Sequence, residues 1–196
     1  MQEPSSGPGP EPGNQEKSPG ELVPPAARGY LASFWQEAKT VLRHPQQFFD
    51  SMPTEGGWKE PLIFLSTCAG ANAVLSGILS FNLLTMVMIF PATLVGCFLA
   101  SLVANALAGA MGGKGTYEST FRVFAYSEAP MLIGWIPVIG MLGILYVWVL
   151  NYFGLRKVHE LSEGKTVVVV LLSGLIAAFV LGLAACGIAL RSILKF

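Results

Sequence analysis

The sequence contains few charged residues for its length. Asp, Glu, Lys and Arg make up 12% of its 196 residues, about half the fraction found in soluble domains. Acidic and basic residues are equal in number, so the formal net charge is zero and no basic excess indicates binding to nucleic acid. The mean hydropathy is +0.57. These values exclude an ordinary soluble domain and a nucleic-acid-binding module.

Histidine and cysteine are scarce as well. His44 and His159 fall in two separate predicted loops, so they do not form a metal pair at helical spacing. Cys68, Cys97 and Cys186 lie within apolar runs without a CxxC motif, which favours small buried hydrophobic residues over disulfides. No Ser-His-Asp or Cys-His arrangement can be assigned to one side of a membrane. We therefore expect no metal site, no cofactor and no enzymatic activity.

Long apolar runs are what the sequence does contain. A helix crosses a bilayer with about 20 apolar residues, and five stretches of roughly this length or longer follow one another. They cover residues 62–81, 83–111, 116–134, 137–155 and 166–190. The predicted fold is an all-α membrane protein in which residues 61–196 form a domain of five transmembrane helices.

Two further segments precede this domain. Residues 1–29 are rich in Pro and Gly and contain almost no large apolar side chains, which predicts a disordered tail. Residues 30–60 begin with apolar and polar residues that recur at helical spacing. We predict an amphipathic interfacial helix and a linker, with Phe34 and Trp35 in the headgroup plane. Packing of this helix against a partner protein is the alternative.

The third apolar stretch is unusual because it contains charged residues and a proline. Glu118 and Arg122 are spaced i, i+4, so they can form an ion pair on one helix face. Glu128 follows Glu118 by ten residues, roughly 15 Å along a helix, and Pro130 leaves a backbone carbonyl without its helical donor. With Tyr126, these residues form a candidate intramembrane polar site for a solute or a proton. Structural pairing or exposure at the membrane surface is the alternative.

Small residues recur at every fourth position in the second and fifth stretches. Such stripes allow helix backbones to approach closely in lipid, where no hydrophobic force drives helices together. We predict that these stripes serve packing within the chain or dimerisation. The residues are Ala100, Ala104, Ala108 and Gly112 in the second stretch, and Gly174, Ala178 and Gly182 in the fifth.

The distribution of basic residues predicts the orientation. With five spans, the N-terminus and the loops after the second and fourth stretches share one side, and only Arg191 and Lys195 lie on the other. The positive-inside rule then places the N-terminus in the cytoplasm and the C-terminus outside. A re-entrant third stretch would move Arg156, Lys157 and Lys165 to the outside, which favours five spans.

The second half of the chain contains a series of short motifs. They are Gly112-Gly113-x-Gly-Thr, Ala125-Tyr126-Ser127-x-x-Pro130, Ile136-Pro137-x-x-Gly140, Phe153-Gly154-Leu155 and His159-x-Leu161-Ser162, and Arg43-His-Pro45-x-x-Phe48-Phe49 precedes the first span. In this order the motifs resemble the Yip domain family, the Ypt/Rab-interacting membrane proteins, and particularly its bacterial branch. The resemblance covers about residues 30–190.

This resemblance implies a five-helix membrane bundle with a cytoplasmic N-terminus. Eukaryotic relatives bind Rab-type GTPases and act in vesicle traffic or membrane shaping, so such a GTPase is an expected partner only for a eukaryotic source. Those relatives have an Asp-Leu-Tyr-Gly-Pro segment before the first span, where this chain has Pro61-Leu62-Ile63. The bacterial branch implies the bacterial cytoplasmic (inner) membrane, and a Golgi or ER membrane is the alternative.

Two functions are compatible with these features. The tail, the amphipathic helix and the absence of catalytic groups favour a non-enzymatic membrane scaffold or adaptor in membrane shaping or trafficking, and we prefer this interpretation. Its partners would be the lipid bilayer and a second copy of the chain or another membrane protein. Glu128 beside Pro130 favours the alternative, a transporter or channel for a small solute, ion or proton that uses the third span.

Overall fold

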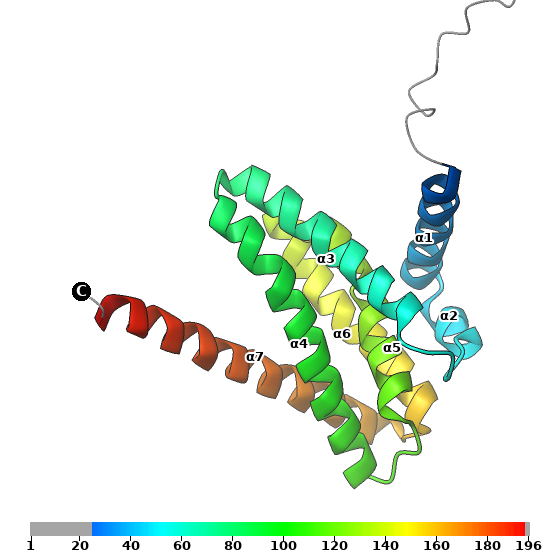
Figure 1. The fold of residues 1–196 in the computed structure, drawn as a ribbon. Helices are drawn as coiled ribbons and strands as arrows, with labels where there is room; N and C mark the ends of the chain where they lie inside the picture. The colour runs from blue at the N-terminus through cyan, green and yellow to red at the C-terminus, as the bar shows by residue number, and fades with distance from the viewer. Residues whose placement is uncertain (1–24, 195–196) are drawn as a thin grey trace, which may run out of the picture. The chain divides into compact units, whose positions relative to one another are not determined.

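The computed structural model describes residues 25–194, which form seven α-helices and one 3₁₀ helix, η2, without a strand in that range (Figure 1). The predicted disordered tail lies mainly in residues 1–24, outside the described part. The chain divides into two compact units, residues 1–35 and 36–196. The boundary falls within α1 (Pro25–Arg43).

The first half of α1 belongs to the first unit. The helix begins five residues before its predicted start, because proline at residue 25 fits the first helical position, where no intrahelical N–H donor is needed. The ring centroids of Phe34 and Trp35 are 6.1 Å apart. Phe34 is buried, whereas 53% of Trp35 is exposed. The position of these two residues in the headgroup plane stays a prediction.

The second half of α1 contacts α6 in the second unit, and α2 (Pro45–Ser51) packs against α6 as well. Ala38 is fully buried. The hydroxyl of Tyr146, on α6 (Pro137–His159), donates a hydrogen bond of 2.7 Å to the carbonyl oxygen of Leu42. This part of the predicted interfacial helix is therefore attached to the protein on one face.

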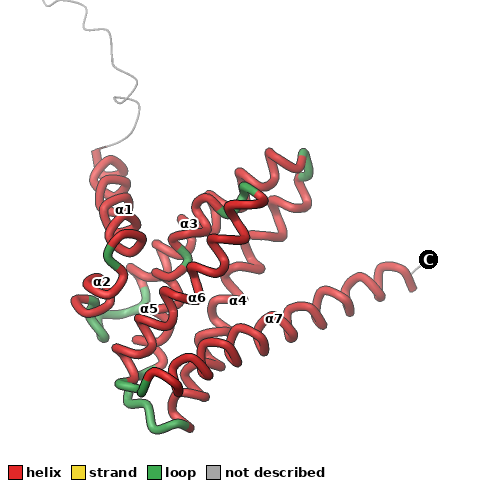
Figure 2. The backbone as a smooth tube through the Cα atoms, turned by 180° about the vertical axis from the view of Figure 1, so that it is seen from behind, coloured by secondary structure: helices red, strands yellow, loops and turns green. Residues whose placement is uncertain are grey.

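The first two membrane helices, α3 (Lys59–Ser80) and α4 (Leu83–Ala110), form an antiparallel hairpin (Figures 1 and 2). Phe81 takes the left-handed conformation with φ 49°, and the Asn82 side chain accepts hydrogen bonds from two of the first N–H groups of α4. Gly77 lies so close to α4 that a Cβ atom would not fit without a shift. Both helices agree closely with the predicted first and second spans.

The predicted third span is divided into two short helices, α5 (Tyr117–Ser127) and η2 (Ala129–Ile133). α5 ends because Pro130 has no N–H group and its ring would clash with a carbonyl one turn earlier. Residues 119–127 are all buried, since α5 packs against α3, α4 and α6. Most polar side chains of α5, Arg122 among them, are thus enclosed by the other helices.

The last two helices, α6 and α7 (Glu163–Leu194), complete the second unit. Gly154 of α6 faces Val123 of α5 so closely that the contact leaves no space for a Cβ atom. α7 packs against α4 and α6 and diverges from the α3–α4 hairpin toward its C-terminal end (Figure 2).

The small-residue stripe of α4 lies partly in the core. Ala104 and Ala108 are fully buried, and Ala100 is half-buried. Gly112 differs from the prediction, because α4 ends at residue 110 and Gly112 is an exposed turn residue with φ 88°. Its role is to reverse the chain, which requires a left-handed backbone conformation that glycine adopts without strain.

The stripe of α7 lies beside the face that packs. Ala177 is buried and Gly174 lies against the Trp148 ring. Ala178 and Gly182 are exposed, so they do not form the packed face of α7 in this chain. Successive helical residues are about 100° apart, and the predicted stripe is turned by one residue from the buried face. Dimerisation through Ala178 and Gly182 stays a prediction.

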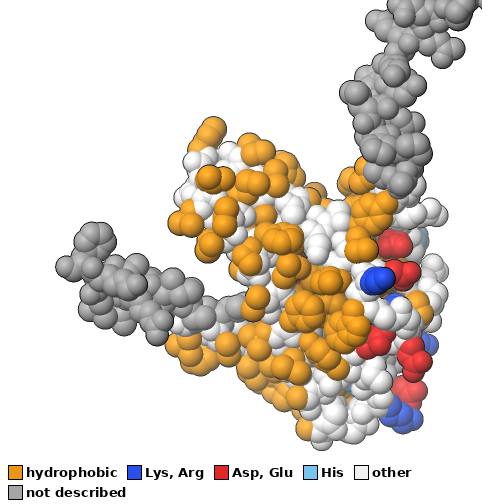
Figure 3. Space-filling view, viewed as in Figure 1, with side chains coloured by type: hydrophobic (Ala, Val, Ile, Leu, Met, Phe, Trp, Pro, Cys, Tyr) orange, Lys and Arg blue, Asp and Glu red, His pale blue; other side chains and the backbone are white. Residues whose placement is uncertain are grey.

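Charged residues gather at one end of the membrane helices, which we call the charged end (Figure 3). The loop between α4 and α5 meets the junction of α6 and α7 there. The Lys165 ammonium donates to the carbonyl oxygen of Met111 at 2.8 Å, and the backbone N–H of Lys114 donates to the carbonyl oxygen of His159 at 3.2 Å. At the opposite end, the hairpin turn exposes 96% of Phe81.

Four helices in the described part of the chain are long and apolar enough to cross a membrane. They are α3, α4, α6 and α7, the last counted over residues 163–180. α5 is not among them, because it has only 11 residues. The protein is thus a multi-pass integral membrane protein, and its regular secondary structure over residues 25–194 is helical.

Candidate functional site

Arg122 is the largest fully buried side chain of the described residues, and it binds the loop before α3. Its guanidinium donates to the carbonyl oxygen of Gly57 at 2.8 Å and to that of Pro53 at 3.4 Å. The Glu118 carboxylate accepts from the Gly57 N–H at 2.7 Å and lies 3.7 Å from Arg122 Nε. The ion pair predicted from the spacing therefore forms, and both partners bind the backbone of Gly57 in the 52–58 loop.

We call the contacts of Glu118 and Arg122 with Gly57 the clamp. Aromatic rings cover the clamp on its α4 side. Trp58 at the end of the loop lies 5.0 Å from Phe121, and Phe121 stacks on Phe98 of α4 at 4.5 Å between ring centroids. The Tyr117 hydroxyl donates to the carbonyl oxygen of Phe98 at 3.3 Å. The rings reduce the access of water to the Arg122 guanidinium, which strengthens its hydrogen bonds.

His159 is a second buried polar residue at the charged end, and sequence reasoning placed it in a loop. It is the last residue of α6 and is only 1% exposed. Its Nε2 lies 2.8 Å from the Thr120 hydroxyl, which also lies 2.8 Å from the carbonyl oxygen of Thr116. The same hydroxyl lies 3.2 Å from the side-chain oxygen of Asn105, so Thr120 connects the end of α6 with α4 and α5. Gly113 and Gly115 lie against the ring, with no room for a Cβ atom, and these glycines are the signal that could have identified it.

Glu128 lies where α5 gives way to η2, one and a half turns beyond Arg122. It is half-buried, and no hydrogen bond or ion pair joins its carboxylate to the described residues. The thiols of Cys68 on α3 and Cys97 on α4 are near enough to interact with it electrostatically. Arg122 is directed to the 52–58 loop instead.

The other two predicted site residues are packing residues. The Tyr126 ring lies between Phe48 of α2 at 5.1 Å and Phe64 of α3 at 4.9 Å. Pro130 is buried in the first turn of η2. The structure thus separates the five predicted residues into two groups, Glu118 with Arg122 at the charged end and the other three deeper in the protein. A functional role for either group stays a prediction.

A polar pocket at the charged end was not predicted. It has a volume of about 390 Å³ and lies between α2 and the end of α6. Its lining residues are Gln46, Asp50, Phe153, Arg156, Lys157 and Glu160. Sequence reasoning missed it because the two helices are about 100 residues apart in the chain, although an aromatic pair followed by two basic residues was visible in α6.

Ion pairs connect this pocket with its surroundings. Lys157 lies 3.6 Å from Asp50 across the pocket, and Arg156 lies 3.0 Å from Glu163 of α7. The Lys114 ammonium is 2.7 Å from the Glu160 carboxylate. This hydrogen bond raises the pKa of Lys114 and lowers the pKa of Glu160. Both signs of charge are therefore maintained around the pocket at neutral pH.

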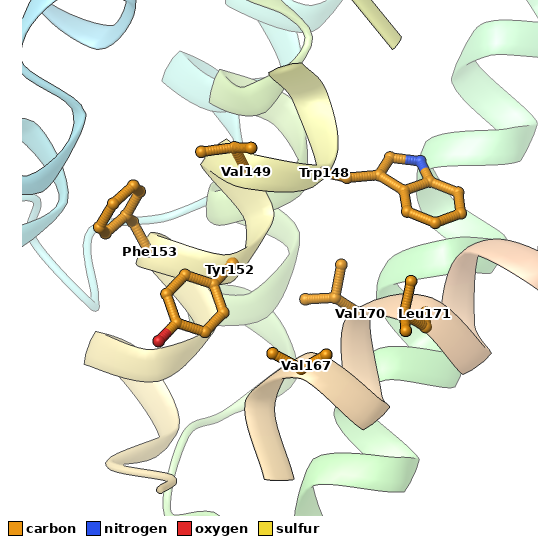
Figure 4. Close-up of a pocket in the computed structure, with 7 residues that line it drawn as sticks. All are labelled: Trp148, Val149, Tyr152, Phe153, Val167, Val170 and Leu171. Atoms are coloured by element: carbon orange, nitrogen blue, oxygen red, sulfur yellow. The ribbon is translucent and has the colours of Figure 1, made fainter. Parts of the chain in front are cut away.

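An apolar groove of about 390 Å³ adjoins the pocket between α6 and α7. Figure 4 shows its lining residues, with the side chains of α6 above those of α7. They are Trp148, Val149, Tyr152, Phe153, Val167, Val170 and Leu171. No residue of α5 lines the groove or the polar pocket.

Comparison with known proteins identifies a family for this fold. The Yip1 domain matches residues 39–185, from the second half of α1 to the middle of α7. This range includes the clamp around Arg122, the buried His159 and both cavities. No curated protein and no solved structure matches the chain at a significant level. Because the match covers more than half of the sequence, the chain belongs to the Yip1 domain family.

Proposed function

We propose that the protein is a non-enzymatic membrane scaffold or adaptor in membrane shaping or trafficking, and that it acts through its charged end. The observation that supports this best is the clamp on Gly57. Glu118 and Arg122 both bind its backbone, so the buried charges of α5 hold the 52–58 loop in place. A fixed loop beside α2 presents a defined surface to a partner.

The same clamp argues against the transporter alternative. A cation or solute pathway through the third span would need polar groups that are free to bind the transported species. Arg122 is bound to two loop carbonyls and Tyr126 is held between two rings. Glu128 alone keeps a carboxylate that could serve such a pathway.

We further propose five membrane crossings. α4 and α6 both end at the charged end, where the loop after α4 contacts His159. α6 has 23 residues, which corresponds to about 35 Å of helix. The chain must therefore travel from the charged end to the start of α6 within residues 117–136. α5 and η2 make this crossing, with residues 119–127, Ala129 and Pro130 buried against the neighbouring helices.

The proposed orientation places the charged end in the cytoplasm, because basic residues are retained on that side. It has Lys59, Lys114, Arg156 and Lys157, whereas residues 61–113 and 129–155 contain no charged residue. The family motifs support a bacterial cytoplasmic membrane. A second copy of the chain or another membrane protein is the proposed partner, and a Rab-type GTPase would serve only in a eukaryotic source.

The scaffold proposal is tested by reversing charge on the clamped surface. Glu55 and Glu60 are exposed and contact neither cavity. A partner surface that complements Glu55 and Glu60 is basic. Glu55→Lys with Glu60→Lys should therefore lower the amount of co-purifying membrane protein about tenfold, since like charges at an interface are strongly unfavourable. The measurement is quantitative mass spectrometry of the tagged protein in mild detergent. Phe81→Lys, at the opposite end, is the control and should leave the amount unchanged.

One set of results would favour the transporter over the scaffold. Wild-type protein in proteoliposomes would conduct an ion or solute, Glu128→Gln would abolish this flux, and the double charge reversal would leave both flux and co-purification unchanged. The scaffold proposal would then be rejected.

A further inference from the structure

We propose that the apolar groove and the polar pocket form one binding site for a single phospholipid with a zwitterionic headgroup. The acyl chain lies in the groove between α6 and α7, and the headgroup lies in the pocket between α2 and α6. The proposal rests on the membrane placement of the charged end and does not depend on the scaffold function.

The two cavities adjoin each other. Phe153 lines both of them. Tyr152 lines the groove, and its hydroxyl accepts a hydrogen bond of 3.3 Å from Arg156 Nη1, which belongs to the pocket. A tyrosine with its ring in an apolar groove and its hydroxyl on an arginine marks a boundary between apolar and polar surroundings. The combined site is therefore amphipathic along its length.

The charged and apolar parts of the site are arranged along the membrane normal. Arg156 and Lys157 lie at the charged end, at the level of the headgroups. The groove extends along α6 to Trp148, eight residues earlier, which is about 12 Å toward the membrane centre. A lipid of the same leaflet has its charged group and its acyl chains in this same order, so its parts meet matching surfaces without tilting. Each cavity falls in the size range of ligand pockets, about 300–1,000 Å³.

The charges select a zwitterionic headgroup. Two basic residues, Arg156 and Lys157, face two acidic residues, Asp50 and Glu160, so the pocket has no excess of either sign. Arg156 presents several N–H donors to a phosphate, whereas the carboxylates accept hydrogen bonds from an ammonium group. Phosphatidylethanolamine provides both groups. An anionic lipid would place its negative charge beside the two carboxylates, which repel it.

The ion pairs at the pocket do not block this binding. The side chains of Arg156, Lys157 and Asp50 are about half exposed, and exposed pairs of this kind contribute little to stability. Arg156 uses one nitrogen for Tyr152 and another for Glu163, and its five N–H donors leave capacity for a phosphate. The headgroup therefore inserts among the existing charges.

The test uses the full chain in vesicles with equal amounts of phosphatidylethanolamine and phosphatidylglycerol, followed by native mass spectrometry after gentle detergent extraction. The wild-type protein should retain one phosphatidylethanolamine. Val167→Trp fills the groove from a position that is 44% exposed and should lower the retained fraction about tenfold. Val168→Trp is the matched control, since residue 168 is similarly exposed and does not line the groove.

The headgroup is tested separately. Asp50→Asn with Glu160→Gln removes both carboxylates and leaves the basic residues, so the ratio of bound phosphatidylethanolamine to phosphatidylglycerol should fall about tenfold. The proposal is overturned by equal retention in the two tryptophan variants or by preference of the wild type for phosphatidylglycerol. A dimer mass that Val167→Trp abolishes would also overturn it, because the groove would then hold a second copy of the chain.

Discussion

α5 and α7 meet the membrane in opposite ways. α5 has 11 residues, and residues 119–127 are buried inside the protein with polar groups among them. α7 has 32 residues, contains no charge between residues 166 and 190, and exposes large apolar side chains such as Phe179 and Leu175. The acyl chains of lipids solvate apolar side chains, but they offer no hydrogen bonds. The short polar helix is therefore stabilised by protein contacts, and the long apolar helix by the bilayer.

This difference explains why the centre of the protein is polar. The Arg122 clamp and the His159–Thr120 hydrogen bond both join α5 to segments distant in sequence. Small buried residues of α4 such as Ala104 and Ala108 allow the helix backbones to approach closely around these contacts. Substitutions in α5 should consequently cost much more stability than substitutions of exposed residues in α7.

The largest effect is expected for Arg122→Leu. The substitution leaves two loop carbonyls and the Glu118 carboxylate without their buried cation, and removal of one partner from a buried pair costs about 3 kcal/mol. The measurement is the free energy of unfolding in mixed detergent micelles. Leu175→Ala on α7 is the control and should change this free energy by less than about 0.5 kcal/mol. Equal losses in both variants would show that α5 is not held by its polar contacts.

A smaller effect is expected for His159→Leu. The variant removes the hydrogen bond to Thr120 from a buried position, which costs about 1–2 kcal/mol, and detergent unfolding again measures it. His44→Leu is the control, because His44 is exposed and its replacement should have almost no effect. A His159→Leu protein as stable as His44→Leu would contradict the assigned contact between α5 and α6.

The long apolar helices could be predicted from the sequence because lipid imposes a simple requirement on length and hydropathy. α3, α4 and α6 begin within a few residues of the predicted spans. The start of α1 was missed because Pro25 lies in a proline-rich segment and was assigned to the tail. α5 and η2 were predicted as one polar span interrupted at Pro130, and the structure has two short helices there.

The contacts of the candidate site were only partly predictable. The i, i+4 spacing predicted the pair of Glu118 with Arg122, but nothing local indicated that Gly57, more than 60 residues earlier, is the common partner. The packed face of α7 was missed because small and apolar residues surround this helix on all sides. Pairing of α2 with the end of α6, which forms the polar pocket, depends on tertiary structure alone.

The central claim is that residues 117–136 cross the membrane, so that the charged end and the start of α6 lie on opposite sides. Single cysteines at Lys114→Cys and Val138→Cys, in a background with Cys68, Cys97 and Cys186 replaced by Ala, test it with a membrane-impermeant thiol reagent on intact cells and on inverted vesicles. Residue 114 lies in the loop before α5, and Val138 is 73% exposed. The account predicts labelling of Lys114→Cys only in inverted vesicles and of Val138→Cys only in intact cells. Labelling of both from the same side would contradict it.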